Sequence, residues 1–181
     1  EYRAQRRGGV GVVDLDTKEE DFVNLFITAS THDNLLFFSD RGKVYQIKMY
    51  DVPEGKRATR GKSVMNFLPL AEDEKVSSVL PLKADTKTAE SIMLVTKAGV
   101  AKKVSLESLK EVRRSGIIAI TLEAGDELLT AFLVGPGDEA IVATREGKAI
   151  RFKESEVRQM GRSAMGVRVI KLKKDDRIVG A

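Results

Sequence analysis

Paired arginines followed by glycines lie near the start of the chain, in the segment Gln5-Arg6-Arg7-Gly8-Gly9-Val10-Gly11. A guanidinium offers a planar fork of N–H donors that matches a phosphate, and glycine lets backbone N–H groups approach an anion closely. A flexible Arg-Gly segment or a plain glycine turn has the same composition, so the segment alone leaves those alternatives open. As a candidate phosphate-binding box, called the box below, we take Gln5, Arg6, Arg7, Gly8, Gly9 and Gly11.

Positive charge then recurs in three separated segments of the chain. Residues 40–62, 95–116 and 145–168 each carry a formal charge of +4, whereas residues 63–94 carry −2 and residues 117–144 carry −5. A solvated surface without function would mix its signs, so this separation favours a basic edge that follows the phosphate backbone of a nucleic acid. The candidate DNA-binding residues, called the rim set, are Arg41, Lys43, Arg60, Lys62, Lys97, Lys102, Lys103, Arg113, Arg114, Arg145, Lys148, Arg151 and Arg162.

The composition of these segments also indicates which nucleic acid they suit. They hold few aromatic side chains, so stacking on single-stranded bases is less favoured than contact with a duplex backbone. No recognition helix is evident, so we expect weak sequence preference and sensitivity to DNA bending.

One segment nearly matches a nucleotide-binding loop. Residues 55–63 read Gly-Lys-Arg-Ala-Thr-Arg-Gly-Lys-Ser, but five residues separate the two glycines, where the motif has four. The equivalent repeat positions at Gly116 and Gly166 lack the Lys-Ser pair. We therefore interpret residues 55–63 as a basic loop that does not bind ATP.

Candidate nucleophiles lack the partners that catalysis needs. His32 is the single histidine, and its two neighbours on a strand would point to the opposite face, which is poor geometry for a triad. Tyr2, Tyr45 and Tyr50 could in principle attack a DNA phosphate, but no acidic metal cluster accompanies them. We expect a non-catalytic chain without a metal site or cofactor of its own.

Three hairpins must position the basic residues. Residues 36–47, 93–104 and 141–152 each read as an apolar strand, a Ser/Thr-x-x-Gly turn and a second strand. The second strands alternate with period two, so one side faces a core and the other carries basic residues. The inward column is Ile47, Val104 and Phe152, and the outward one is Gln46, Lys103 and Arg151.

A second glycine column completes each repeat. Gly61, Gly116 and Gly166 each open an apolar run that reads as a third strand, and a short acidic turn leads to a fourth. We predict an all-β, propeller-like domain with under about a tenth of helix, built from four-stranded blades of about fifty residues. Short helical turns are expected only within residues 105–112 and 154–160. The predicted units of this single domain, about three and a half blades over residues 1–181, are 1–31 (the second half of a blade), 32–82, 83–135 and 136–181.

Composition agrees with a folded domain. The chain has 181 residues, 42% of them hydrophobic, with no cysteine and a net charge of +4. This content suffices for a core, excludes a disulfide framework and thiol chemistry, and makes the cytoplasm the default setting. No membrane span or signal peptide is expected.

Several segments resemble one known family. Residues 1–11, Ser30-Thr31-His32-Asp33, Leu36-Phe37-Phe38, Arg41-Gly42-Lys43-Val44-Tyr45 and residues 160–167 are similar to the C-terminal domains of DNA gyrase A proteins, in bacterial type II topoisomerases, and the box resembles the gyrase box. The resemblance implies a β-pinwheel whose basic rim wraps double-stranded DNA, so that the holoenzyme can introduce negative supercoils with ATP. It also implies gyrase B and the rest of gyrase A as partners in an A2B2 assembly near the nucleoid. The catalytic tyrosine and the sites that use ATP and Mg²⁺ would then lie in other parts of that assembly.

The chain departs from that family's pattern at Val10, where members usually carry Lys or Arg, and it lacks the first hairpin and the last blades. Two other interpretations remain open. The equivalent domain of topoisomerase IV typically has a degraded box, whereas residues 5–9 are retained here. A propeller-like protein-interaction module would explain the repeats but not the separated charge.

Overall fold

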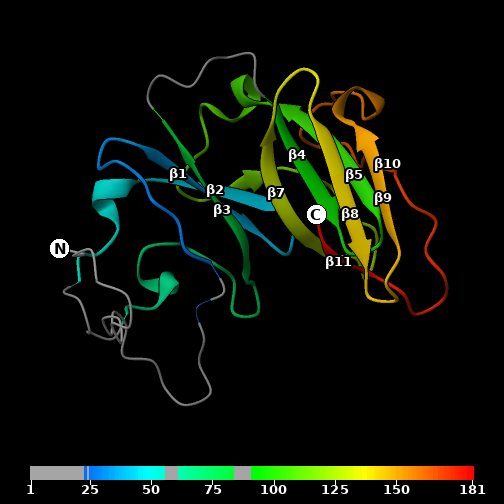
Figure 1. Ribbon diagram of the computed structural model, residues 1–181. Coiled ribbons are helices and arrows are strands. Elements are labelled where there is room, and N and C mark those ends of the chain that lie inside the picture. The colour runs from blue at the N-terminus through cyan, green and yellow to red at the C-terminus, as the bar shows by residue number, and fades with distance from the viewer. Residues whose placement is uncertain (1–22, 24, 56–60, 84–90) are drawn as a thin grey trace, which may run out of the picture.

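The computed structural model describes residues 23, 25–55, 61–83 and 91–181. In these residues the regular elements are β-strands and short 3-10 turns, and no α-helix occurs (Figure 1). The all-β prediction is confirmed. No helix in the described part of the chain is long and apolar enough to cross a membrane.

Eleven strands form three antiparallel sheets that lie next to one another like blades (Figure 1). In spatial order, the first sheet contains β3 (Val76–Leu82), β1 (Asn34–Ser39), β2 (Lys43–Lys48) and β6 (Ile117–Ile118). The second contains β10 (Val167–Arg168), β5 (Val100–Ser105), β4 (Ser91–Thr96) and β7 (Leu128–Val134). The third contains β11 (Ile178–Gly180), β8 (Glu139–Thr144) and β9 (Ala149–Lys153). The 3-10 turns are η1 (Met49–Asp51), η2 (Val64–Asn66), η3 (Leu106–Leu109) and η4 (Glu154–Glu156).

The three predicted hairpins are present as β1–β2, β4–β5 and β8–β9. Their turn glycines, Gly42, Gly99 and Gly147, have φ angles of +73°, +81° and +79°. A residue with a side chain adopts such angles only at a cost, which explains the glycine column. η3 and η4 lie within the two segments where helical turns were predicted.

We call the predicted units 32–82, 83–135 and 136–181 the first, middle and last modules. The third strand of the middle or last module does not join the sheet that contains the hairpin of that module. β6 follows β5 along the chain but pairs with β2, with Ile117 opposite Val44. Likewise β10 pairs with β5 of the preceding module, with Val167 opposite Ala101. Each of these modules therefore contributes one strand to the sheet before it, an exchange that the repeat pattern alone did not indicate.

One predicted strand is wrong. We expected a third strand after Gly61, but Val64–Asn66 form the 3-10 turn η2. In the later modules this strand is only two residues long, and it exists by pairing with the hairpin of the preceding module. For Val64–Asn66, the described residues include no such pairing with an earlier hairpin.

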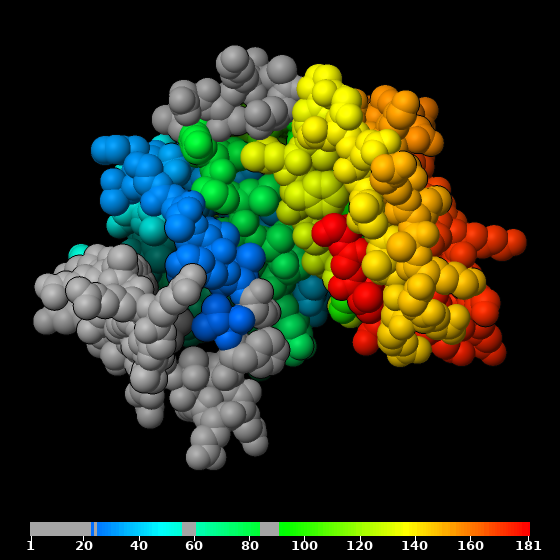
Figure 2. All heavy atoms as spheres, in the orientation of Figure 1, coloured from blue at the N-terminus to red at the C-terminus, as the bar shows by residue number. Residues whose placement is uncertain are grey.

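The sheets pack face to face around separate apolar layers. Leu36 and Phe38 of β1 pack in one layer with Ile92 and Leu94 of β4, between the first and second sheets. The opposite face of β4 contributes to a second layer, which Phe152 of the third sheet joins. All six residues of β4 are therefore buried, whereas the outer face of the third sheet leaves alternate residues exposed. Figure 2 shows the modules in the same order, with the blue residues of the first, the green middle module and the yellow to red last module next to one another.

Candidate nucleic-acid interface

The box and Arg60 lie outside the described residues. The other rim residues lie in three environments, which we name by position. The loop edge is formed by Lys43 and the basic loops before β6 and β10. The tip edge is formed by the hairpin turns and the acidic turns beside them. The remaining positions, Lys102, Lys103 and Arg151, lie on the second strands of hairpins.

The loop edge contains a pocket to which three modules contribute. It is a cavity of about 550 Å³ lined by Lys43, residues 115–118, Arg162 and Ser163. Lys43 lies at the start of β2, opposite Ile118 of β6, so strand exchange brings the next module's loop to this lysine. The lining holds two cations and two serine hydroxyls and no carboxylate. This combination of a lysine, an arginine and hydroxyl donors suits a phosphate group.

Further cations extend the loop edge beyond this pocket. Arg113 and Arg114 are exposed on the loop that leads into the pocket at Ser115, and Arg162 is itself exposed. Lys62, which follows Gly61 in the first module, is also exposed but does not line this cavity. The fold thus brings Lys43 and Arg162, which are distant in sequence, to one cavity.

The tip edge has a different electrostatic character. A cavity of about 600 Å³ there is lined by three cations and four carboxylates: Arg41, Lys75, Lys97, Asp40, Asp73, Asp126 and Glu127, together with Leu122. Lys97 forms an ion pair with Glu127. In the last module, Arg145 donates from its guanidinium to the carbonyl oxygen of Asp175 at 2.9 Å, and Lys148 is exposed nearby on the same turn. The predicted rim cations at these tips therefore face acidic or carbonyl groups of the same protein.

The acidic turns have a structural role that the sequence interpretation missed. Asp126 Oδ1 accepts hydrogen bonds from the backbone N–H groups of Ala98 (2.9 Å) and Glu127 (2.8 Å). Asp176 Oδ1 makes the equivalent contacts with Glu146 (3.2 Å) and Arg177 (2.9 Å). Each carboxylate thus ties a hairpin tip to the start of the following strand. The recurrence of an acid just before that strand was the available signal.

Lys102 is wrongly placed in the rim set. Its side chain is fully buried, and its ammonium donates to the carbonyl oxygens of Ala119 (2.8 Å), Ala164 (2.9 Å) and Arg162. Burial lowers the pKa of Lys102 to about 8, and the nearby positive charge of Arg162 acts in the same direction. Period-two alternation places Lys102 on the same inward face as Val104, so the strand pattern already contained this information.

The other two strand cations are partly or fully accessible. Lys103 is half-buried and forms an ion pair with Glu154, whose carbonyl oxygen also accepts from its ammonium at 3.2 Å. Arg151 is exposed and contacts Glu139 at 3.2 Å. An exposed pair of this kind contributes at most about 1 kcal/mol, so Arg151 remains available to another anion.

The second glycine column forms the joints between modules. A Cβ on Gly116 would lie 2.5 Å from Cε1 of Tyr45, and one on Gly166 would lie 2.7 Å from the carbonyl oxygen of Ala101. Both glycines also have positive φ angles, of +79° and +111°. The next module can approach β2 or β5 this closely only where it has no side chain.

Tyr45 at the first joint is not disposed as a nucleophile. Its hydroxyl donates to the buried carboxylate of Glu74, with 2.9 Å to each oxygen. Burial raises the pKa of Tyr45, and the hydrogen bond to Glu74 and its negative charge raise it further. Tyr50 is exposed on η1, and Tyr2 lies outside the described residues. In the part of the chain that the structure describes, no group of acids and histidines could hold a metal ion.

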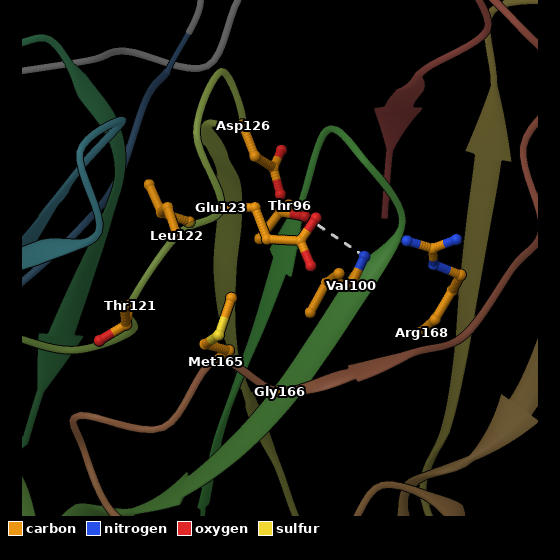
Figure 3. Close-up of a pocket in the computed structure, with 9 residues that line it drawn as sticks. All are labelled: Thr96, Val100, Thr121, Leu122, Glu123, Asp126, Met165, Gly166 and Arg168. Carbon is orange, nitrogen blue, oxygen red and sulfur yellow. Dashed lines mark hydrogen bonds between the residues drawn. The ribbon is translucent and has the colours of Figure 1, made fainter.

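A smaller pocket marks the joint at Gly166 (Figure 3). This cavity of about 230 Å³ lies between the ends of β4 and β5, the turn before β7, and the start of β10. Glu123 and Asp126 come from the turn, whereas Arg168 extends from β10 on the other side of Val100 (Figure 3). The Val100 N–H donates to Thr96 Oγ1 at 3.2 Å. Its mixed charge distinguishes this pocket from the loop-edge pocket.

Comparison with known proteins agrees with the repeated sheets. Residues 1–29, 33–83, 90–134 and 138–181 match the family described as DNA gyrase C-terminal domain, beta-propeller. The chain belongs to this family. Membership confirms the propeller-like fold and the family resemblance seen in the sequence.

Members of the gyrase C-terminal domain family include close relatives of this chain. It is 42% identical over 179 residues to the DNA gyrase A proteins of Salmonella typhimurium and Escherichia coli K12, and 40% identical to that of Staphylococcus aureus NCTC 8325. These alignments cover 99% of this chain and 20% of each relative. The chain thus spans about a fifth of the length of these relatives.

Solved structures of gyrase-type C-terminal domains have the same fold. A DNA gyrase A C-terminal domain aligns with a TM-score of 0.73 and 26% identity, over 98% of this chain and 57% of that one. The C-terminal domain of a DNA topoisomerase IV aligns with a TM-score of 0.75 and 30% identity, over 83% of this chain and 46% of that one.

Proposed function

We propose that this chain is a DNA-binding and DNA-wrapping module of a DNA gyrase A protein. The observation that carries the proposal is the loop-edge pocket, where three successive modules bring Lys43, Arg162 and two serines together without a carboxylate. A duplex following this edge would meet cations from each module in turn. Such contacts are directed at phosphates, so binding is weakly sequence-specific and falls steeply as salt rises.

Wrapping needs contacts at successive points, because DNA is stiff over tens of base pairs and stays bent only if the contacts persist along the arc. The basic loops of successive modules provide such points. The box, which lies outside the described residues, would add two guanidiniums to these contacts. We infer that Arg6 and Arg7 shape the path of DNA more than they set its overall affinity.

The wider assignment follows from the relatives. In the intact enzyme this module would act with the rest of gyrase A and with gyrase B in an A2B2 assembly near the nucleoid, and ATP and Mg²⁺ would be used elsewhere in that assembly. The alternative is the equivalent domain of topoisomerase IV, which the structural similarity to such a domain favours. The retained segment Gln5-Arg6-Arg7-Gly8-Gly9 supports the gyrase assignment.

A salt titration of duplex binding tests the DNA-binding edge. In the intact protein, Arg113→Ala with Arg114→Ala should weaken binding to all sequences alike and lower the slope of log K against log salt by roughly 0.9 for each lost phosphate contact. Lys171→Ala with Lys174→Ala is the matched control, because both lysines are exposed and lie on the segment leading to the last acidic turn. An unchanged slope in the arginine variant would move the binding face elsewhere.

A second experiment tests the role of the box. Arg6→Ala with Arg7→Ala in the reconstituted holoenzyme should abolish negative supercoiling while relaxation and cleavage persist, and Val10→Lys should strengthen wrapping. Topoisomer analysis on agarose gels measures both effects. Supercoiling at the unmodified rate in the double alanine variant would refute the role of the box.

A further inference from the structure

Lys102 lies where segments of two modules meet. It projects from β5 of the middle module, and its ammonium contacts the carbonyl oxygen of Ala119, which follows β6 of that module. Its other two acceptors, the carbonyl oxygens of Arg162 and Ala164, belong to the loop that precedes β10 of the last module. The ammonium has three N–H donors, and each has an acceptor.

A buried ammonium is strongly destabilising unless hydrogen bonds compensate it, so the burial of Lys102 depends on its three carbonyl acceptors. The equivalent position of the preceding module is occupied differently. Tyr45 packs its ring against Gly116, and its hydroxyl donates to the carboxylate of Glu74 within its own module. The joint at Lys102 therefore connects backbone segments of two modules in a way that the Tyr45 joint does not.

The loop that Lys102 holds is the loop that carries Arg162 to the loop-edge pocket. Thr121 adds two parallel contacts to the same loop: its N–H donates to the carbonyl oxygen of Ala164 at 3.3 Å, and its Oγ1 donates to that of Ser163 at 2.8 Å. Because Lys102 binds the carbonyl of Arg162 itself, this anchor acts on the backbone from which the guanidinium projects. Arg162 then lines the same cavity as Lys43.

We propose that Lys102 is a positioning residue for DNA binding: its buried ammonium anchors the loop of the next module and so holds Arg162 beside Lys43 for a shared phosphate. The proposal rests on the proposed DNA-binding function. It assigns to Lys102 an effect on phosphate contact that it cannot make directly, since its side chain is fully buried.

A double-mutant cycle on the salt dependence tests this role. In the intact protein, Arg162→Ala should lower the slope of log K against log salt for a short duplex by roughly 0.9, the value for one phosphate contact. Lys102→Met should lower it by a similar amount, and the double variant by no more than Arg162→Ala alone, because both changes remove the same contact. Lys171→Met, which removes an exposed charge, should leave the slope unchanged.

Two outcomes would overturn the proposal: an unchanged slope in Lys102→Met, or a double variant that loses the sum of the single losses. A general loss of folded protein would lower the active fraction without changing the slope. Thermal unfolding of each variant without DNA identifies that case.

If Lys102→Met does not fold, Thr121→Val takes its place in the cycle, because it loosens the same loop without altering a buried charge. Additivity between Thr121→Val and Arg162→Ala would then count against the proposal.

The experiment also distinguishes failure of the proposed function from failure of the role of Lys102. If the unmodified protein binds duplex without salt dependence, the proposed function is wrong. If it shows the dependence but the cycle is additive, only the role of Lys102 is wrong.

Discussion

The loop edge and the tip edge both carry predicted rim cations, yet they differ in what surrounds them. Lys43 and Arg162 line a cavity without a carboxylate, whereas Arg41 and Lys97 line one with four carboxylates. The charge of a segment therefore does not decide whether its cations are available to DNA. The acids that the fold brings to those cations from elsewhere in the chain decide it.

The difference arises from how each edge is built. At the tips, a carboxylate must accept backbone N–H groups to close the connection into the fourth strand, as Asp126 does for Ala98. At the loop edge, β6 and β10 close the joint through glycine and backbone pairing. The tip edge therefore needs carboxylates for its structure. The loop-edge pocket, which Lys43 and Arg162 line, contains none.

The largest expected effect is a difference in unfolding free energy between substitutions at two glycines that have the same φ angle. Gly116, at a joint, and Gly147, at a tip, both have φ of +79°, but a Cβ would meet Tyr45 only in the first case, since nothing lies within 4 Å of the second. Gly147→Ala should cost roughly 1–2 kcal/mol of unfolding free energy from the backbone alone. Gly116→Ala should cost roughly 1–3 kcal/mol more through overpacking. Denaturant unfolding measures both, and equal losses would contradict the tight joint.

The second prediction compares the two edges in DNA binding. Lys43→Ala with Arg162→Ala should weaken duplex binding by at least roughly tenfold, since a hydrogen bond to a charged group contributes about 1.5–3 kcal/mol. Arg41→Ala with Lys97→Ala should weaken it by less than roughly threefold, because acids already compensate those cations. Mobility shifts at fixed salt provide the measurement. Equal losses from the two pairs would mean that DNA contacts both edges.

The third prediction concerns pH and Glu74, the acid of the first described turn. Burial by itself would raise the pKa of Glu74. Hydrogen bonds from Ser39, the Ala71 N–H and Tyr45, together with the positive charge of Lys43, outweigh burial and hold this pKa below its ordinary value of 4.5. Such a carboxylate stabilises the fold above its ordinary pKa, and this contribution is lost as pH falls through the folded value. Glu74→Gln should therefore flatten the loss of unfolding free energy below pH 4.5.

Urea unfolding at several acidic pH values tests the role of Glu74. Glu123→Gln, at an exposed acid, is the control and should retain the unmodified slope. A Glu74→Gln variant with the same acid sensitivity as the unmodified protein would show that other carboxylates determine it.

The smallest effect is expected from making the tip edge less acidic. Lys97 holds the pKa of Glu127 below its ordinary value through their hydrogen bond, but the pair is exposed. Glu127→Gln should change the unfolding free energy by less than about 1 kcal/mol. It should raise duplex affinity by no more than roughly twofold, because one released cation adds little to a long basic path. A larger rise would assign the tips a direct share in binding.

Local features of this fold were predictable from the sequence. The three hairpins and the helical turns near residues 105–112 and 154–160 depend on glycine turns and short-range alternation, which the sequence displays directly. The exchange of β6 and β10 was not predictable, because a short apolar run does not indicate which sheet receives it. The alternation in β5 already indicated that Lys102 faces inward, but the acceptors of its ammonium depend on that exchange, since two of the three belong to the next module.

The site was predicted in part. Lys43, Arg113, Arg114 and Arg162 were identified because loops rich in cations recur at equivalent repeat positions. The gathering of Lys43 and Arg162 around one cavity, the ion pair of Lys97 with Glu127, and the placement of Arg41 in a cavity with acids depend on contacts between segments far apart in the chain. No local pattern encodes such contacts.

The offset between repeat and sheet also limits how the array can change in length. Since β6 and β10 occupy the same place in successive sheets, inserting or removing one whole repeat would preserve this backbone pairing between neighbouring modules. A break that separates β2 from the residues around 118 instead leaves the backbone of β2 without its neighbour. Expression fragments designed on sequence repeats should therefore extend past the next short strand, or their exposed strand edges will promote aggregation.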